Sequence, residues 1–149
     1  MMLGKYFSLE EMTKSQTAIR RGINNIPSDQ ELENLVELIK NVLDPVREHF
    51  KKSVTVNSGY RGKKLNKLIK GSKNSQHCKG QAADIEIIGI SNYDLACWIR
   101  DNMDFDQLIL EFHNRKVPDS GWVHVSWNSP KKNRKQTLTI DSNGTKQGF

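Results

Sequence analysis

The sequence has little cysteine, no long apolar run and no leader-like N-terminus. Its two cysteines, Cys78 and Cys97, are too few for the disulfide framework of a small secreted domain, so we expect free thiols. No segment approaches the roughly 20 apolar residues that a membrane-spanning helix needs. Residues 1–5 lack the apolar core of a signal peptide. We therefore expect synthesis in the cytoplasm and no membrane insertion.

Internal repeats, low-complexity segments and linkers rich in proline, glycine or serine are also absent. The 149 residues suffice for one domain with a hydrophobic core. A content of 36% hydrophobic and 27% charged residues is ordinary for a globular protein. We expect one domain over residues 1–149, and we expect it to be a monomer.

Acidic residues are missing between positions 51 and 79, where nine lysines and arginines stand. A second basic cluster lies within residues 131–135, and the net charge of the chain is +6. Such a field attracts polyanions, either nucleic acid or an anionic cell-wall polymer, although a solvated surface has the same composition. No helix-turn-helix, zinc-finger or aromatic stacking pattern accompanies the charge, so the sequence does not favour nucleic acid as a partner.

Helix signals dominate the first third of the chain. Capping boxes at Ser8–Glu11 and Ser28–Glu31 predict two helix starts. Apolar residues then recur at helical spacing from position 32 to position 43. Pro45 predicts a break or kink near Asp44, with residues 46–50 continuing as one or two further turns.

Strand signals dominate the rest of the chain. Helices are predicted over 63–70, ending at Gly71, and from position 91 onward. Short β-branched or alternating runs predict strands at 54–56, 82–88, 107–112, 122–127 and 136–140, the last at a sheet edge. Because helices precede strands, the sequence predicts an α+β fold with a mostly antiparallel sheet and helices packed mainly on one side.

Two histidines and an aspartate form a candidate metal site. His77 lies in a polar loop, and Asp84 follows seven residues later at the start of a strand. His124 stands between two valines of another strand, so its side chain points to the opposite face. Two imidazoles and a carboxylate suit zinc and leave a fourth position for water. From these residues alone, the simpler reading is that His77 is an exposed loop residue and His124 a half-buried, hydrogen-bonded one.

Three ordered blocks resemble a known family. They are Ser-Gly-Tyr-Arg at 58–61, the pattern Ser-x-His-x-x-Gly-x-Ala-x-Asp at 75–84, and Trp-Val-His-Val-Ser at 122–126. Together they resemble the zinc D-Ala-D-Ala carboxypeptidases, the M15 peptidases, which include phage endolysins and D-alanyl-D-alanine dipeptidases. Residues 6–11 and 43–48 also resemble the N-terminal helices of that family. The resemblance spans roughly residues 5 to 127, whereas residues 128–149 do not align.

The resemblance implies roles for particular residues. His77, Asp84 and His124 fall on the ligands of one Zn²⁺ ion, and Arg61 falls on the arginine that stabilises the substrate's carbonyl oxygen or carboxylate. Many members carry an acid three positions before the last histidine, where this sequence has Gly121.

Another residue must therefore supply the catalytic carboxylate. Glu111 is the best replacement, because the related hedgehog zinc fold has a similar Phe-Asp strand that ends in Glu. Asp119 is the second candidate. Ser75, Tyr60 and Trp122 are candidate substrate contacts.

The implied function is a zinc peptidase that hydrolyses peptidoglycan stem peptides. Zinc-activated water would attack the amide, with a carboxylate moving the proton. The bond could be the D-Ala-D-Ala terminus or an internal one, and action on the wall after release would suit a phage-type enzyme. The alternative is a non-catalytic zinc-containing binding module of the same fold, which Gly121 keeps open.

Overall fold

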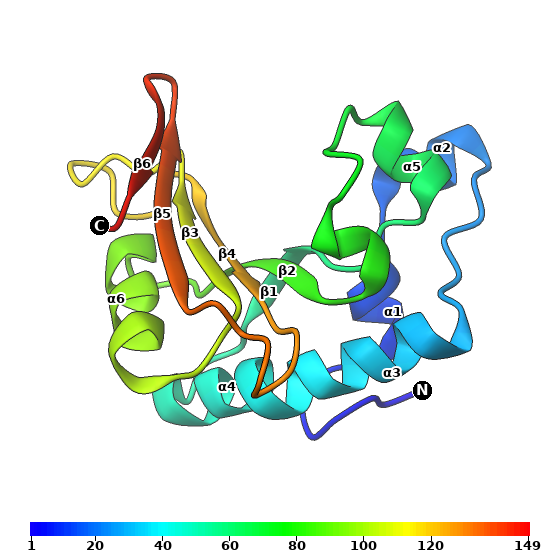
Figure 1. Ribbon diagram of the computed structural model, residues 1–149, viewed down its shortest axis with the longest axis horizontal. Coiled ribbons are helices and arrows are strands. Elements are labelled where there is room, and N and C mark those ends of the chain that lie inside the picture. The colour runs from blue at the N-terminus through cyan, green and yellow to red at the C-terminus, as the bar shows by residue number, and fades with distance from the viewer.

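Helices occupy the first third of the chain and strands dominate the remainder (Figure 1). The computed structural model describes all residues from 1 to 149. Its helical elements are α1 Leu9–Thr13, α2 Gln16–Arg21, α3 Asp29–Leu38, the π turn η1 Ile39–Leu43, α4 Asp44–Phe50, α5 Lys63–Leu68, the 3-10 helix η2 Gln76–Lys79 and α6 Asn92–Asn102. Its strands are β1 Thr55–Ser58, β2 Ala82–Glu86, β3 Gln107–Glu111, β4 Trp122–Ser126, β5 Gln136–Asp141 and β6 Gly144–Gln147.

The two predicted capping boxes are confirmed. Ser8 caps α1 with Glu11 as its reciprocal partner. At α3, the Ser28 hydroxyl accepts from the Glu31 backbone N–H at 3.3 Å, and the Glu31 carboxylate accepts from the Ser28 N–H at 2.9 Å. Each box satisfies backbone N–H groups that have no partner inside the helix.

None of the helices combines the length and the apolar character that a bilayer crossing demands.

Pro45 does not end the helix that begins at Asp29. Instead α3, η1 and α4 follow one another without interruption along one side of the molecule (Figure 1). Proline lacks an N–H and its ring clashes with the carbonyl four residues earlier. A wider π turn accommodates the ring, and the Asp44 N–H donates to Ile39, five residues back. The disturbance lies where the sequence predicts it, but the chain remains helical.

The six strands form one mostly antiparallel sheet in the order β1-β2-β4-β3-β5-β6. The exception is β3, which pairs with β5 in parallel. This order confirms the predicted α+β fold but corrects the prediction that 136–140 lies at an edge. Strand β5 is internal because β6, which the sequence analysis missed along with α2, pairs with its other side.

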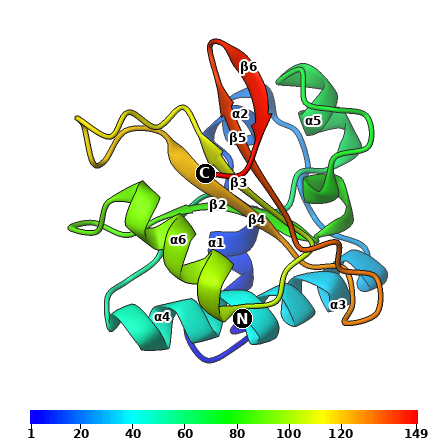
Figure 2. The same ribbon diagram turned by 60° about the vertical axis from the view of Figure 1, so that its left-hand side comes forward.

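Strict alternation gives the central strands two different faces. The apolar face carries Ala83, Ile85, Leu108, Leu110, Val123 and Val125, all buried. These residues form one core with Leu35, Leu38 and Val42 of the long helix and with Leu95 and Ile99 of α6. The opposite face carries Asp84, Glu111 and His124. Figures 1 and 2 show α6 on one side of the sheet and α5 on the other.

We predict that Ser28→Ala lowers the free energy of unfolding by about 1 kcal/mol, because it removes the cap of the long helix. Urea unfolding followed by circular dichroism measures this change. Ser53→Ala is the matched control, since Ser53 is exposed and outside every helix, and it should change stability by less than about 0.5 kcal/mol. Equal stabilities for the two variants would show that the capping box contributes little.

Candidate metal centre and active site

The sheet and one loop bring the three predicted metal ligands together. Asp84 in β2 pairs directly with His124 in β4, so both side chains lie on the polar face. Oδ1 of Asp84 lies 3.0 Å from Nδ1 of His124 and 3.4 Å from Nε2 of His77. One ligand atom from each residue lies within 4.8 Å of the other two. The structure therefore confirms that three distant segments converge at one point.

Local backbone chemistry places His77. The side chain of Ser75 caps η2 by accepting from the His77 N–H at 3.2 Å. Gly80 ends η2 in the left-handed conformation with φ of 72°. A Cβ at Gly80 would overlap the backbone carbonyl of Glu31, so a larger residue could not pack against α3 here. The glycine thus lets the loop lie directly on the long helix.

The ring of His77 is held in one orientation. Nδ1 lies 2.7 Å from the carbonyl oxygen of Gly59, and because a carbonyl only accepts, Nδ1 carries the hydrogen. The unprotonated Nε2 is then the atom that faces Asp84. Burial lowers the pKa of His77, which favours the neutral ring that binds metals. A backbone acceptor behind a metal-binding histidine is a common way to fix its tautomer.

Asp84 is held in its charged form. Burial alone would raise the pKa of this carboxyl group, but the hydrogen bond from Nδ1 of His124 outweighs burial and holds the pKa well below its usual range. A buried carboxylate between two imidazoles is a donor set that suits zinc, and three protein ligands are the number found at catalytic zinc sites. The residues present therefore fit the metal that the resemblance implies.

Glu111 lies beside this group. It stands opposite Trp122 in the β3–β4 pairing, and its Oε2 accepts from the indole N–H of Trp122 at 2.7 Å. Burial and the neighbouring charge of Asp84 raise the pKa of Glu111, against the opposing effects of His124, Trp122 and Arg61. A carboxylate with a raised pKa is suited to accept and return a proton near neutral pH.

Arg61 has a hydrogen-bond donor that no group of the protein accepts from. Its backbone N–H donates to the carbonyl of His77 at 3.1 Å, and its Nη2 lies 3.4 Å from the hydroxyl of Ser75. Its Nε is buried and has no hydrogen-bond partner. Because a buried donor without a partner is costly, the free Nε supports a role for Arg61 in binding a ligand.

One cavity contains most of the predicted site residues. It has a volume of about 440 Å³, and its walls include Arg61, Ser75, the three candidate metal ligands, Glu111 and Trp122. Asp119 does not line it and lies in an exposed turn. Tyr60 also lies elsewhere: it is 6% exposed and belongs to the core, where burial and Glu31 raise its pKa to about 12. Placing Tyr60 among the substrate contacts therefore finds no support.

The family model described as Peptidase M15 matches residues 5–126 of the chain, almost the whole span of the predicted resemblance. The chain belongs to the M15 peptidase family. No curated protein matches it. M15 peptidases are zinc-dependent hydrolases of peptide bonds, so this chain is a peptidase whose His77, Asp84 and His124 form a possible metal-binding group.

The geometry at Gly121 explains why this M15 peptidase has no acid there. Gly121 has φ of 67°, a conformation that side chains rarely adopt. A Cβ at this position would overlap the carbonyl of Glu111 and the backbone of Phe112. The backbone therefore leaves no room for an acidic side chain, and Glu111 is the carboxylate that the neighbouring strand brings to the cavity.

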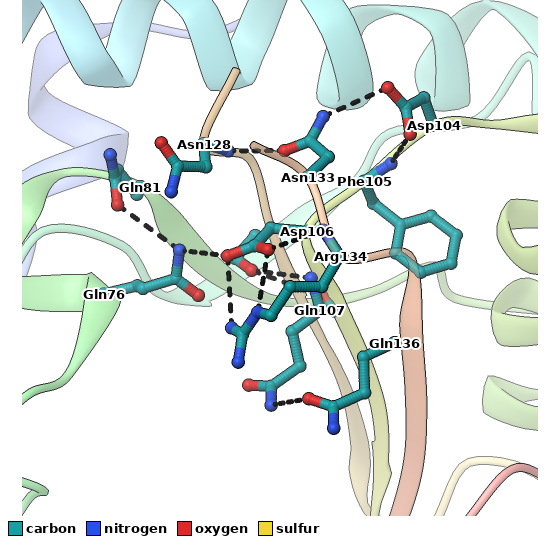
Figure 3. Close-up of polar contacts among 11 residues, drawn as sticks. Gln76, Gln81, Asp104, Phe105, Asp106, Gln107, Asn128, Asn133, Arg134 and Gln136 are labelled. Carbon is teal, nitrogen blue, oxygen red and sulfur yellow. Dashed lines mark hydrogen bonds and ion pairs between the residues drawn. The ribbon is translucent and has the colours of Figure 1, made fainter. Parts of the chain in front are cut away.

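A second polar group at the cavity went unrecognised in the sequence. Gln76, Asp106 and Arg134 form a connected network, and both Gln76 and Arg134 line the cavity (Figure 3). Arg134 stands among three lysines, and such a run of basic residues suggests only a solvated surface. The one available signal was Asp106, which stands between Phe105 and a predicted strand. A carboxylate buried at such a position needs a charged or hydrogen-bonding partner.

We predict that Gly121→Ala lowers the free energy of unfolding by about 3 kcal/mol, because backbone strain and overlap with Glu111 add together. Gly22→Ala is the matched control. Gly22 has nearly the same φ, 63°, but nothing lies within 4 Å of a Cβ there. The control should lose only about 1 kcal/mol of strain energy. Chemical denaturation of both variants tests this, and equal losses would contradict the overlap.

Proposed function

We propose that this M15 peptidase hydrolyses peptidoglycan stem peptides with a single zinc ion bound by His77, Asp84 and His124. The observation that carries the proposal is the convergence of these three side chains at a cavity that also holds a carboxylate and a guanidinium. Bound zinc supplies Lewis acidity, which lowers the pKa of water from about 15.7 to about 7 and polarises a carbonyl.

The chain's own residues carry the proton and the charge in this proposal. Glu111 accepts the proton of the attacking water and then donates it to the leaving amine. The indole of Trp122 keeps the carboxylate pointed in one direction by its 2.7 Å hydrogen bond. Arg61 stabilises the negative charge that develops on the carbonyl oxygen, because its guanidinium stays charged and retains free donors.

Charge, in addition to the family, supports this substrate class. The cavity carries the guanidinium groups of Arg61 and Arg134, and the chain has a net charge of +6. Stem peptides bear free carboxylates and lie in a wall with anionic polymers, so both features favour them as ligands. The bond is either the terminal D-Ala-D-Ala amide or an internal amide of the stem peptide, and phage-type release to the wall remains a prediction.

We predict that the purified protein binds one zinc ion per chain. His77→Ala and His124→Ala should lose the metal, whereas His49→Ala should retain it, because His49 stacks on Trp98 away from the cavity. Elemental analysis measures the stoichiometry. Zinc at about 100 times its Kd should also stabilise the native protein by about 2.7 kcal/mol, a gain that a chelator removes. Zinc retained by all three variants at equal stoichiometry would disprove the ligand assignment.

We predict that Glu111→Gln lowers turnover by about 10² to 10⁴-fold while zinc stays bound, because the amide still accepts from Trp122 but cannot take a proton. Asp119→Asn is the control and should leave turnover unchanged. Digestion of purified sacculi and of a D-Ala-D-Ala pentapeptide, read by mass spectrometry, measures turnover and identifies the bond. A zinc-loaded wild-type protein that cleaves neither substrate would favour the non-catalytic binding module instead.

A further inference from the structure

Arg134 reaches the metal cavity from a segment outside the family match. It lies in the connection between β4 and β5, beyond the matched residues 5–126, and it lines the same cavity as Arg61 and the metal-binding group. Figure 3 shows its guanidinium directed at the Asp106 carboxylate, with Gln107 nearby. The cavity therefore has one wall that belongs to the C-terminal part of this chain.

Asp106 fixes the side chain of Arg134. One carboxylate oxygen accepts from the backbone N–H and from Nε of Arg134, both at 2.9 Å. The other accepts from Nη2 of Arg134 at 3.1 Å and from the amide of Gln76 at 2.8 Å. Asp106 is only 2% exposed. An ion pair with a buried, two-point partner holds a long side chain far more firmly than an exposed pair does.

The carboxyl group of Asp106 is ionised. Burial alone would raise the pKa of its carboxyl group, but the donors from Arg134 and Gln76 outweigh burial and hold the pKa below its usual range. Arg134 therefore faces an ionised partner at neutral pH. The orientation of the Arg134 side chain is therefore set before a ligand binds, which reduces the entropic cost of binding.

The contacts of Arg134 leave one edge of its guanidinium free. A guanidinium has five N–H donors in a flat fork. Asp106 takes Nε and one hydrogen of Nη2, and Nη1 has no partner within the chain. The side chain of Arg134 is 53% exposed, and Arg134 lines the cavity. The edge formed by Nη1 and Nη2 is thus available for a second carboxylate, which it can bind with two parallel hydrogen bonds.

We propose that Arg134 forms a carboxylate-binding subsite that selects peptides with a free carboxylate away from the bond to be cut. This inference rests on the proposed peptidase function and specifies its substrate. Arg61 lies against the metal-binding loop through Ser75 and the carbonyl of His77. Arg134 lies on the Asp106 side of the cavity and is a second, separate cation.

The network also fixes the position of the subsite relative to the metal-binding group. Gln76 directly precedes His77 in η2, and its side-chain amide donates to the same Asp106 oxygen that Arg134 contacts. The loop that carries a metal ligand and the loop that carries Arg134 are thus tied to one carboxylate. A substrate carboxylate on Arg134 would therefore determine which amide of the peptide lies over the metal-binding side chains.

The test uses the zinc-loaded full chain and the pentapeptide L-Ala-γ-D-Glu-L-Lys-D-Ala-D-Ala. Two derivatives carry an amide in place of one carboxylate each, either the α-carboxylate of D-Glu or the terminal carboxylate. Arg134→Ala should lower kcat/KM for the parent peptide by about 10- to 100-fold. Most of this loss should lie in KM, because the contact is remote from the reacting bond. Arg134→Lys should recover part of it, since it keeps the charge but not the fork.

The derivative that loses the contacted carboxylate should be cleaved equally by the wild type and by Arg134→Ala, and this identifies which of the two carboxylates binds. That comparison within one variant also separates a lost contact from a general loss of folding. Lys132→Ala is the matched control, because Lys132 is an exposed cation of the same loop that does not line the cavity. It should match the wild type on every peptide.

Calorimetric binding of the three peptides separates this inference from the proposed function. If the wild type cleaves none of them, the proposed function fails, but a preference for a carboxylate over its amide that Arg134→Ala abolishes still supports the subsite. The inference is overturned if neither of the two amidations changes binding or cleavage by the wild type. It is equally overturned if Arg134→Ala retains the full preference for the carboxylate.

Discussion

The buried carboxylate of Asp84 between two imidazole rings is the interaction on which the rest of the site depends. A charge removed from water is costly unless other groups compensate it. Here the hydrogen bond from His124 at 3.0 Å provides that compensation, and Nε2 of His77 lies 3.4 Å from the same carboxylate oxygen. The first depends on the register of β2 with β4, in which a slip of one residue would turn His124 into the core. The second depends on the capped loop between Ser75 and Gly80.

Features that depend on neighbouring residues could be predicted from the sequence. The capping boxes at Ser8 and Ser28 and the central strands agree with the structure. The convergence of His77, Asp84 and His124 also agrees, but it is a long-range feature that the family resemblance implied and local pattern did not. The fold class agrees as well, because the order of helical and alternating segments reflects the layers that they form. Periodicity also indicated which face of β4 carries His124.

Features that depend on distant pairing and belong to no family motif could not be predicted. Nothing local marks β5 as internal, because its position is set by parallel pairing with β3 and by the short polar strand β6. Tyr60 directly precedes Arg61, yet one packs in the core and the other reaches the cavity. Arg134 stands among lysines in the sequence. Only its ion pair with the buried Asp106 distinguishes Arg134 from a solvated cation.

The alternation along the central strands separates the residues that pack the core from those that line the cavity. Leu108 and Leu110 of β3 face the core, whereas Gln107, Ile109 and Glu111 between and beside them face the cavity. Substitutions at cavity-facing positions other than Glu111, such as Gln107, can therefore alter which peptides are accepted without disturbing the packing beneath them. Such a sheet lets specificity diversify over evolutionary time, or under laboratory selection, while the scaffold remains unchanged.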